Sequence, residues 1–259
     1  MELRGTVSIV TGGGTGIGRS VCLALARAGS RAVVVNYPEA DAEAARQTAA
    51  DVSGYGVEGW AYLCDVTCDA ACRRMAADAV ERFGRVDVLV NNAGITRHIP
   101  QADLEAVDEE AWDEILDVNL RGAFRCSRAT ASALREARGS IVNIGSIGGL
   151  RSGGSSLPYG VSKAALLQLT RNLAVALAPE VRVNSVSPGL VATRWYRRVD
   201  EAAAEAQERA FAAHAPLSAV AGPEHVAQAV LGLLAMDLVT GENLIVDGGM
   251  HLLYGPPRP

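Results

Sequence analysis

Short apolar runs alternate with longer segments of helical periodicity along the chain. The runs are rich in valine and isoleucine and several are apolar at consecutive positions, as in strands covered on both faces. They are Val7–Val10, Ala32–Asn36, Val57–Leu63, Val86–Val90, Ser140–Ile144, Val181–Val186 and Asn243–Val246. Between them, helices are predicted at Gly16–Ala28, Ala40–Ser53, Ala70–Phe83, Glu109–Arg138 and Tyr159–Ala178. The alternation predicts an α/β fold, a doubly wound parallel sheet of seven strands with helices on both faces.

No linker rich in proline, glycine or serine divides the chain, so residues 1–254 are predicted to form a single domain. The segment 195–215 interrupts the alternation. It is rich in alanine and glutamate, and it predicts a helical insertion beside the substrate. The last residues, 255–259, are expected to be a disordered tail.

Charge and composition exclude several classes of function. A net charge of −5 argues against broad binding to nucleic acid or anionic membrane, which requires a basic face. No apolar stretch approaches the roughly 20 residues of a membrane span, and the first residues lack a signal-peptide pattern. The odd number of cysteines, 5, suits a reduced compartment, so we expect a cytoplasmic protein.

Three cysteines, Cys64, Cys68 and Cys72, are spaced by four residues and raise the question of a metal site. Cys64 belongs to the preceding strand and no histidine lies nearby in the sequence. Because free cysteine is also a common small buried residue, we favour buried thiols and expect no metal.

A glycine-rich turn, Thr11 to Gly18, joins the first predicted strand to the first helix. Glycines there permit a tight turn and a close approach to a pyrophosphate, whose charge meets the N–H groups of the helix start. A plain glycine turn and a site for S-adenosylmethionine are the alternatives.

Tyr159 and Lys163 are four residues apart, so on a helix they share a face. A lysine beside a phenol favours the phenolate and should lower the pKa of Tyr159 from ~10, as a general acid–base residue requires. Ser146 follows the predicted strand Ser140–Ile144, where its hydroxyl could polarise a substrate carbonyl. Separately, these features are also typical of a surface pair and a loop serine.

The motifs, taken in order, resemble the short-chain dehydrogenase/reductase family over about Leu3 to Gly249. They are the Thr-Gly-x-x-x-Gly-Ile-Gly turn, Asp65-Val66, Asn91-Asn92-Ala93-Gly94, Asn119, Ser146, Tyr159 with Lys163, and Pro188-Gly189 with Thr193. The resemblance implies a Rossmann-like fold and an NAD(P)(H)-dependent oxidoreductase acting on a carbonyl or secondary alcohol.

The same resemblance implies roles for individual residues. Tyr159 would exchange the proton, Lys163 would assist it and hold the nicotinamide ribose, Ser146 would orient the substrate oxygen, and Asn119 would maintain a proton path. The implied cofactor site comprises Gly12, Gly14, Thr15, Gly16, Ile17, Gly18, Asn36, Tyr37, Asp65, Val66, Asn91, Ala93, Gly94, Tyr159, Lys163, Pro188, Gly189, Val191 and Thr193. The substrate pocket is expected to include His98, Gly148 and Trp195.

Cofactor and substrate are less closely defined. Asn36 stands where an NAD-binding site usually has a carboxylate, which favours NADP(H) over NAD(H), although Glu39 could repel a 2′-phosphate. Asn-Asn-Ala-Gly-Ile-Thr-Arg is similar to 3-oxoacyl-carrier-protein reductases and implies a small or acyl-carrier-linked carbonyl substrate. Sugar, steroid and polyketide alcohol dehydrogenases of the family stay open, as does a non-catalytic dinucleotide-binding regulator. The segment Val239–Gly249 resembles a strand that many members pack in a subunit interface, so we expect a homotetramer rather than a dimer.

Overall fold

The computed structural model describes residues 1–193 and 201–253 and contains the predicted parallel sheet. The strands are β1 (Val7–Val10), β2 (Ala32–Tyr37), β3 (Glu58–Leu63), β4 (Val88–Asn91), β5 (Ser140–Ile144), β6 (Arg182–Pro188) and β7 (Asn243–Val246). All pairings are parallel, and the strand order is β3-β2-β1-β4-β5-β6-β7. Because the order reverses between β1 and β4, the loops after these two strands open a crevice at the carboxyl edge of the sheet.

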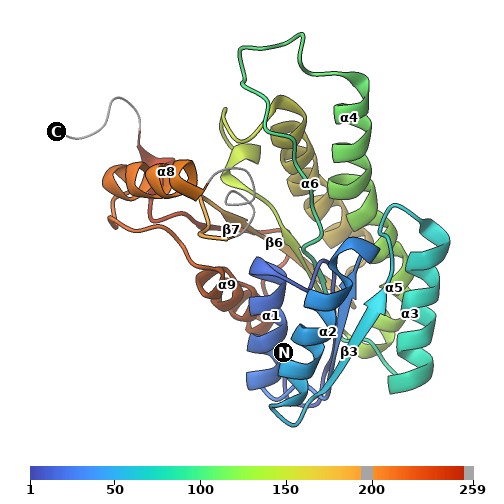
Figure 1. Ribbon diagram of the computed structural model, residues 1–259. Helices are drawn as coiled ribbons and strands as arrows, with labels where there is room; N and C mark the ends of the chain where they lie inside the picture. Colours follow the sequence, from blue (N-terminus) through green and yellow to red (C-terminus); the bar gives the residue numbers. More distant parts are fainter. Residues whose placement is uncertain (194–200, 254–259) are drawn as a thin grey trace.

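Helices cover both faces of the sheet, as the sequence predicts (Figure 1). They are α1 (Gly16–Arg27), α2 (Ala42–Ser53), α3 (Asp69–Phe83), α4 (Glu109–Leu116), α5 (Ala123–Ala137), α6 (Leu157–Ala176), α8 (Glu201–His214) and α9 (Pro223–Ala235). One face packs against α1, α2 and α9, and the other packs against α3, α5 and α6. The alternation along β2 shows why, since Val33 and Val35 belong to the first core and Val34 belongs to the second.

The long helix predicted at Glu109–Arg138 is divided in the structure. Between α4 and α5, residues Asp117–Gly122 adopt a π-helical turn. The widened turn contains Asn119, which is buried and binds the backbone of another loop. Hydrophobic periodicity does not show such a change of winding, and π-turns of this kind are frequent at functional sites.

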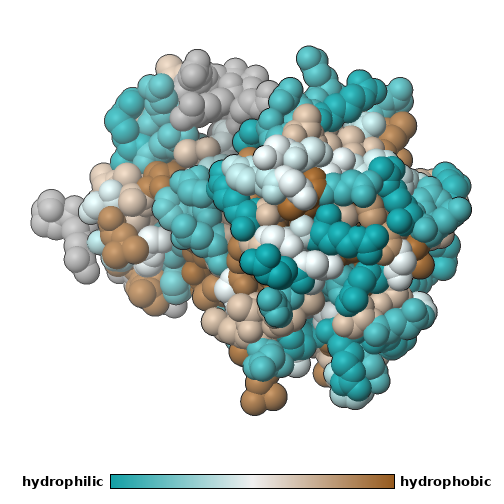
Figure 2. Space-filling view, turned by 90° about the horizontal axis from the view of Figure 1, so that it is seen from below, coloured by the Kyte–Doolittle hydropathy of each residue, from teal (hydrophilic) through white to brown (hydrophobic). Residues whose placement is uncertain are grey.

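The insertion predicted at 195–215 contains α8, whereas Trp195 and the predicted tail 255–259 lie outside the described residues. None of the described helices is long and apolar enough to cross a membrane. On the face of the molecule in Figure 2, hydrophilic side chains predominate and the hydrophobic ones lie in small groups. That face therefore presents no broad apolar field.

Candidate active site

A cavity of about 630 Å³ opens at the carboxyl ends of β1, β4, β5 and β6. Among its lining residues are most of those predicted for the site: Gly12, Thr15, Gly16, Ile17, Asn36, Asp65, Val66, Ala93, Gly94, His98, Ser146, Tyr159, Lys163, Pro188, Gly189, Val191 and Thr193. The cavity thus joins the glycine turn to the Ser–Tyr–Lys residues. Such a crevice is where ligands bind in open α/β sheets.

The glycine turn at the start of α1 leaves room for a ligand against the backbone. Gly12 and Gly16 have φ values of +60° and +52°, a region that favours glycine. A Cβ atom on Gly18 would lie 2.2 Å from the carbonyl oxygen of Gly12. The side chain of Thr15 makes no capping hydrogen bond, so it leaves the first N–H groups of α1 to a ligand. Gly14 and Gly18 shape the turn but do not line the cavity.

Two adjacent asparagines at the end of β4 point in opposite directions. The side chain of Asn91 is buried and donates to Ser127 Oγ and Asn143 Oδ1. Asn92 lines the cavity, and its amide donates to the carbonyl oxygens of Thr11 at 2.9 Å and Gly12 at 3.0 Å. Asn92 therefore holds the glycine turn, although it is not among the residues predicted to bind the cofactor. Alternation along a strand could have indicated it, because neighbouring side chains face opposite ways.

The end of β2 differs from the expected specificity site. The Asn36 side chain is buried, accepts a hydrogen bond from Gly12 N at 3.4 Å and donates to Cys64 O at 2.8 Å. Its polar atoms therefore already connect the glycine turn with the end of β3. Tyr37 packs in the hydrophobic core and does not line the cavity. Two residues that follow, Pro38 and Asp41, do line it.

Ser146 lies two residues after the end of β5 and lines the cavity. Its Oγ accepts a hydrogen bond from Gly148 N at 3.1 Å, which leaves the hydroxyl proton able to donate elsewhere. Gly148 was expected in the substrate pocket, but it does not line the cavity. It orients Ser146 instead. A Cβ atom on the next residue, Gly149, would lie 2.6 Å from the backbone of Lys163, so this turn packs closely on α6.

Tyr159 and Lys163 both face the cavity from α6. The Lys163 Nζ atom lies 5.7 Å from the centre of the Tyr159 ring and donates to the carbonyl oxygen of Ile144 at 2.8 Å. Burial lowers the pKa of Lys163 from 10.5 to about 8. Among the 24 lysines and arginines of the sequence, Lys163 is the single lysine. A buried amine can lose its proton near neutrality, whereas a guanidinium cannot.

Asn119 connects the π-helical turn to α6 and to the loop after β4. Its Oδ1 accepts from Ile95 N at 2.8 Å, and its Nδ2 donates to Ile95 O and to Ser162 Oγ, both at 3.0 Å. Ser162 in turn donates to the carbonyl oxygen of Tyr159 at 2.7 Å. Asn119 does not line the cavity, although a Cβ atom on Gly94 would lie 3.3 Å from its Oδ1. Asn119 instead holds Ile95 directly and Tyr159 through Ser162, and both Ile95 and Tyr159 line the cavity.

Two loops close the side of the cavity near Tyr159. Thr96 hydrogen-bonds Ser155, and Ile99 N donates to Ser155 O at 2.9 Å. His98, in the loop after β4, lines the cavity. Its neighbour Arg97 forms ion pairs with Asp108, just before α4, and with Glu110 and Glu114 in α4. Trp195, the remaining expected pocket residue, lies outside the described residues.

Further lining residues were not expected from the sequence: Pro38, Asp41, Cys64, Thr67, Asn92, Val118, Ile144 and Gly145. Most of them lie within a few residues of a predicted site residue. The sequence alone does not show which of these neighbours face the cavity. Among the described residues, no group of three or more histidines, cysteines or acids is arranged to hold a metal ion.

Residues 12–251 match the family model described as Enoyl-(Acyl carrier protein) reductase. Among solved structures, a short-chain type dehydrogenase/reductase from Mycobacterium marinum is 32% identical with a TM-score of 0.86, covering 96% of each chain. The chain belongs to the short-chain dehydrogenase/reductase family. It is therefore an oxidoreductase acting on carbonyl and CH–OH groups, as the sequence motifs predict.

Curated relatives cover nearly the full length of this short-chain dehydrogenase/reductase. It is 44% identical over 248 residues to a Streptomyces violaceoruber protein named "Granaticin polyketide synthase putative ketoacyl reductase 2", covering 95% of this chain and 96% of that protein. It is 34% identical to the 3-oxoacyl-[acyl-carrier-protein] reductase of Escherichia coli K12, covering 98% and 100%. The structure of NAD⁺-bound xylitol dehydrogenase matches with a TM-score of 0.86 at 30% identity, covering 96% and 100%.

The family implies a nicotinamide cofactor, and the cavity fits one. The glycine turn provides a cradle without side chains, and uncapped N–H groups of α1 face it. Asp65 and Val66 line the cavity beside β3, Tyr159 and Lys163 line it beside β5, and Thr193 lies next to Gly16 of the glycine turn. A dinucleotide can therefore extend from Asp65, past the glycine turn, to Lys163.

Proposed function

We propose that this enzyme reduces a 3-oxoacyl group, presented as a thioester on an acyl carrier, with NADP(H) as its cofactor. The observation that carries the proposal is that Ser146, Tyr159 and Lys163 line the same cavity as the glycine turn. The 3-oxoacyl substrate is supported by the names of the relatives, which include carrier-protein and polyketide ketoacyl reductases.

When bound, a reduced nicotinamide supplies the hydride for this chemistry. In our proposal, the Ser146 hydroxyl donates to the substrate oxygen, because its acceptor role toward Gly148 N leaves its proton available. Tyr159 delivers the proton to that oxygen as the alcohol forms. Lys163, held by the Ile144 carbonyl, favours the phenolate that remains and hydrogen-bonds the nicotinamide ribose.

NADP(H) rather than NAD(H) is supported by the neutral Asn36 at the end of β2, where a carboxylate would select NAD(H). The Asp41 carboxylate lines the same end of the cavity and would oppose a 2′-phosphate. Replacing Asp41 is a cleaner test than replacing Asn36, whose side chain holds Gly12 and Cys64. The variant D41N should increase the preference for NADPH, and a shift toward NADH would count against this assignment.

We also propose that residues 1–254 act as one cytoplasmic domain and assemble as a homotetramer. The strand β7 forms an edge of the sheet, with Leu244 39% exposed and its neighbours half-buried. Unpaired edge strands with apolar side chains suit a subunit interface. Light scattering should give the mass of a tetramer, and a monomer would contradict this assembly.

The activity is tested with a panel of 3-oxoacyl thioesters, cyclic ketones and polyols, each with NADPH and NADH, followed at the nicotinamide absorbance. We expect the highest kcat/KM with a 3-oxoacyl thioester and NADPH. Tyr159→Phe should keep cofactor affinity and lower turnover by roughly 100-fold or more. Preferential oxidation of a polyol would instead indicate a sugar-alcohol dehydrogenase, and binding of both cofactors without turnover of any substrate would indicate a regulator.

A further inference from the structure

Three cysteine sulfurs meet behind the wall of the cavity and have no part in the proposed chemistry. Cys64 follows β3, Cys72 lies in the first turn of α3, and Cys126 lies in the first turn of α5. The Cys126 thiol donates to Cys72 Sγ at 3.7 Å. The Cys64 thiol donates to the carbonyl oxygen of Asp65 at 3.7 Å, and Cys64 packs in the same core cluster as the other two cysteines. All three side chains are buried and reduced. We call Cys64, Cys72 and Cys126 the thiol cluster.

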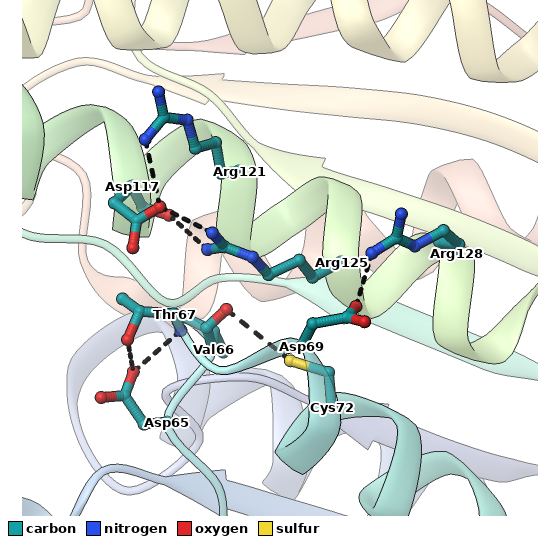
Figure 3. A network of polar contacts seen from close by, with 9 residues as sticks. All are labelled: Asp65, Val66, Thr67, Asp69, Cys72, Asp117, Arg121, Arg125 and Arg128. Atoms are coloured by element: carbon teal, nitrogen blue, oxygen red, sulfur yellow. Dashed lines mark hydrogen bonds and ion pairs between the residues drawn. The ribbon is translucent and has the colours of Figure 1, made fainter.

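The thiol cluster contacts the end of the cavity that Asp65 and Val66 line. Cys64 itself lines the cavity, and Cys72 donates to the carbonyl oxygen of Val66 at 3.6 Å. Figure 3 shows the Cys72 sulfur pointing at this carbonyl from the start of α3. The cavity wall is therefore a short loop with one member of the cluster at each end, Cys64 before it and Cys72 after it.

The surroundings activate one sulfur over the other two. The neighbouring thiols, Cys126 first, and the charge of Arg125 lower the pKa of Cys72 against the opposing effect of burial. The neighbouring Cys72 sulfur and burial raise the pKa values of Cys64 and Cys126. The N-terminal turn of a helix also favours a thiolate. Cys68, between them in sequence, is exposed and outside the cluster.

We propose that the thiol cluster is a peroxide-oxidation site, reached through the cofactor cavity, whose product is a disulfide between Cys64 and Cys72. The geometry supports this pair because Cys64 lines the cavity and belongs to the same buried cluster as Cys72, at the other end of the loop. Cys126 remains on the far side of Cys72, where its thiol supports the reacting sulfur as a hydrogen-bond donor.

The reaction consumes one peroxide and two thiols. The Cys72 thiolate attacks one peroxide oxygen, the O–O bond breaks, and the departing hydroxide takes up the proton that Cys72 had lost. Cys72 is then a sulfenic acid. The Cys64 sulfur then attacks the Cys72 sulfur and displaces the hydroxyl group of the sulfenic acid. That group leaves as water with the Cys64 proton, and the S–S bond forms. Two sulfurs are each oxidised by one electron, and hydrogen peroxide is reduced to water.

The disulfide should weaken cofactor binding. It removes the Cys72 hydrogen bond to Val66 O and draws together the ends of the loop that contains Asp65 and Val66. A cofactor whose adenosine lies against this loop should in turn block the entry of peroxide. This second statement rests on the proposed orientation of the cofactor, whereas the disulfide itself does not.

The test oxidises the whole protein with hydrogen peroxide, alkylates the remaining thiols and digests it with an endoprotease that cleaves before aspartate. Asp65 and Asp69 separate the three cysteines of this region, so Cys64, Cys68 and Cys72 fall in different fragments. We expect a mass loss of two hydrogens and a cross-linked pair containing Cys64 and Cys72. A crosslink to Cys126 or Cys68, or no crosslink, would overturn the proposal.

Matched variants separate the roles of the sulfurs. Cys68→Ser is the control and should form the same crosslink at the wild-type rate. Cys126→Ala should still form it, but several-fold more slowly, and an unchanged rate would refute the supporting role of Cys126. Cys72→Ala, checked for folding by circular dichroism, should leave Cys64 unmodified.

Cofactor protection is measured in the same assay with NADP⁺ or NAD⁺. At about ten times the dissociation constant, the crosslink should form roughly tenfold more slowly. A disulfide that forms equally fast with cofactor would refute access through the cavity. Because the readout is the mass of the fragments, it is independent of whether the 3-oxoacyl substrate has been assigned correctly.

Discussion

The Asn119 side chain hydrogen-bonds both backbone polar groups of Ile95, accepting from its N–H at 2.8 Å and donating to its carbonyl oxygen at 3.0 Å. This pair of hydrogen bonds holds the loop after β4 against the π-helical turn. The remaining amide proton reaches Ser162, which hydrogen-bonds the backbone of Tyr159. The relative position of the two sides of the cavity therefore depends on one buried amide.

For this reason Asn119→Asp should impair catalysis although it hardly changes the shape of the side chain. A carboxylate can accept from Ile95 N but cannot donate to Ile95 O or Ser162. We expect turnover to fall by roughly tenfold or more and the free energy of unfolding to fall by about 1–3 kcal/mol. Steady-state kinetics and urea unfolding measure the two effects.

The control for Asn119 is Ser162→Ala, which removes one partner and keeps the contacts with Ile95. It should cost about 1 kcal/mol of stability while turnover stays within roughly threefold of wild type. Normal turnover in Asn119→Asp, together with reduced stability, would show that Asn119 supports the fold without positioning the catalytic residues.

The buried charge of Lys163 should lower the free energy of unfolding, although the enzyme needs this residue for catalysis. Its pKa falls from 10.5 to about 8 in the folded protein, a difference worth about 3 kcal/mol at ~1.4 kcal/mol per unit. The unfolded chain therefore binds this proton more tightly, and the destabilisation is complete below pH 8 and disappears as the pH rises to 10.5. The hydrogen bond to Ile144 O offsets about 1 kcal/mol of it.

Consequently Lys163→Met should be inactive but more stable than wild type by about 2 kcal/mol at pH 7, and the difference should shrink toward pH 10. Thermal melting across this range tests the sign. Because Lys163 is the single lysine, isotope-labelled lysine gives one side-chain NMR signal, whose titration should have a midpoint near 8. A midpoint near 10.5 would contradict the predicted desolvation.

The adjacent asparagines of β4 offer a matched pair. Asn92→Ala removes the donors to the carbonyls of Thr11 and Gly12, so the glycine turn should lose its shape and the dissociation constant for the cofactor should rise by roughly tenfold. Asn91→Ala removes bonds within the core and should lower stability with little change in affinity. Calorimetric titration and thermal melting would show this division, and equal losses of affinity would refute it.

How far the sequence predicts this structure depends on whether the signal is local. The strands at β1, β5 and β7 have the predicted bounds, because a run of buried apolar residues ended by polar ones is visible in the sequence alone. The motif residues around Ser146, Tyr159 and Lys163 line one cavity as expected from the family. The π-helical turn at Asn119 was not predicted, since it preserves the apolar pattern of a continuous helix.

Contacts between distant elements are the part that the sequence does not show. Cys126 lies 54 residues from Cys72, and they meet only because α3 packs beside α5. The role of Asn36 likewise depends on its bonds to Gly12 and Cys64, which lie in other strands' loops. Residue type alone suggests a specificity residue at position 36, and the folded chain adds a second role, because the Asn36 amide also joins three strands.

Gly18 provides the most direct test of the glycine turn. A Cβ atom there would lie 2.2 Å from Gly12 O and 2.6 Å from Asn92 Nδ2, and backbone contacts of this kind cannot relax cheaply. Gly18→Ala should therefore displace the turn from Asn92 and abolish measurable cofactor binding, with a lower melting temperature.

The matched control is Gly232→Ala, near the end of α9, where a Cβ atom meets nothing within 4 Å. The same chemical change should there stabilise the protein by about 0.5–1 kcal/mol, because alanine is the better helix former, and leave cofactor affinity unchanged. If Gly18→Ala still binds the cofactor with wild-type affinity, the backbone of the turn does not hold the pyrophosphate, and the position proposed for the whole dinucleotide would have to be abandoned.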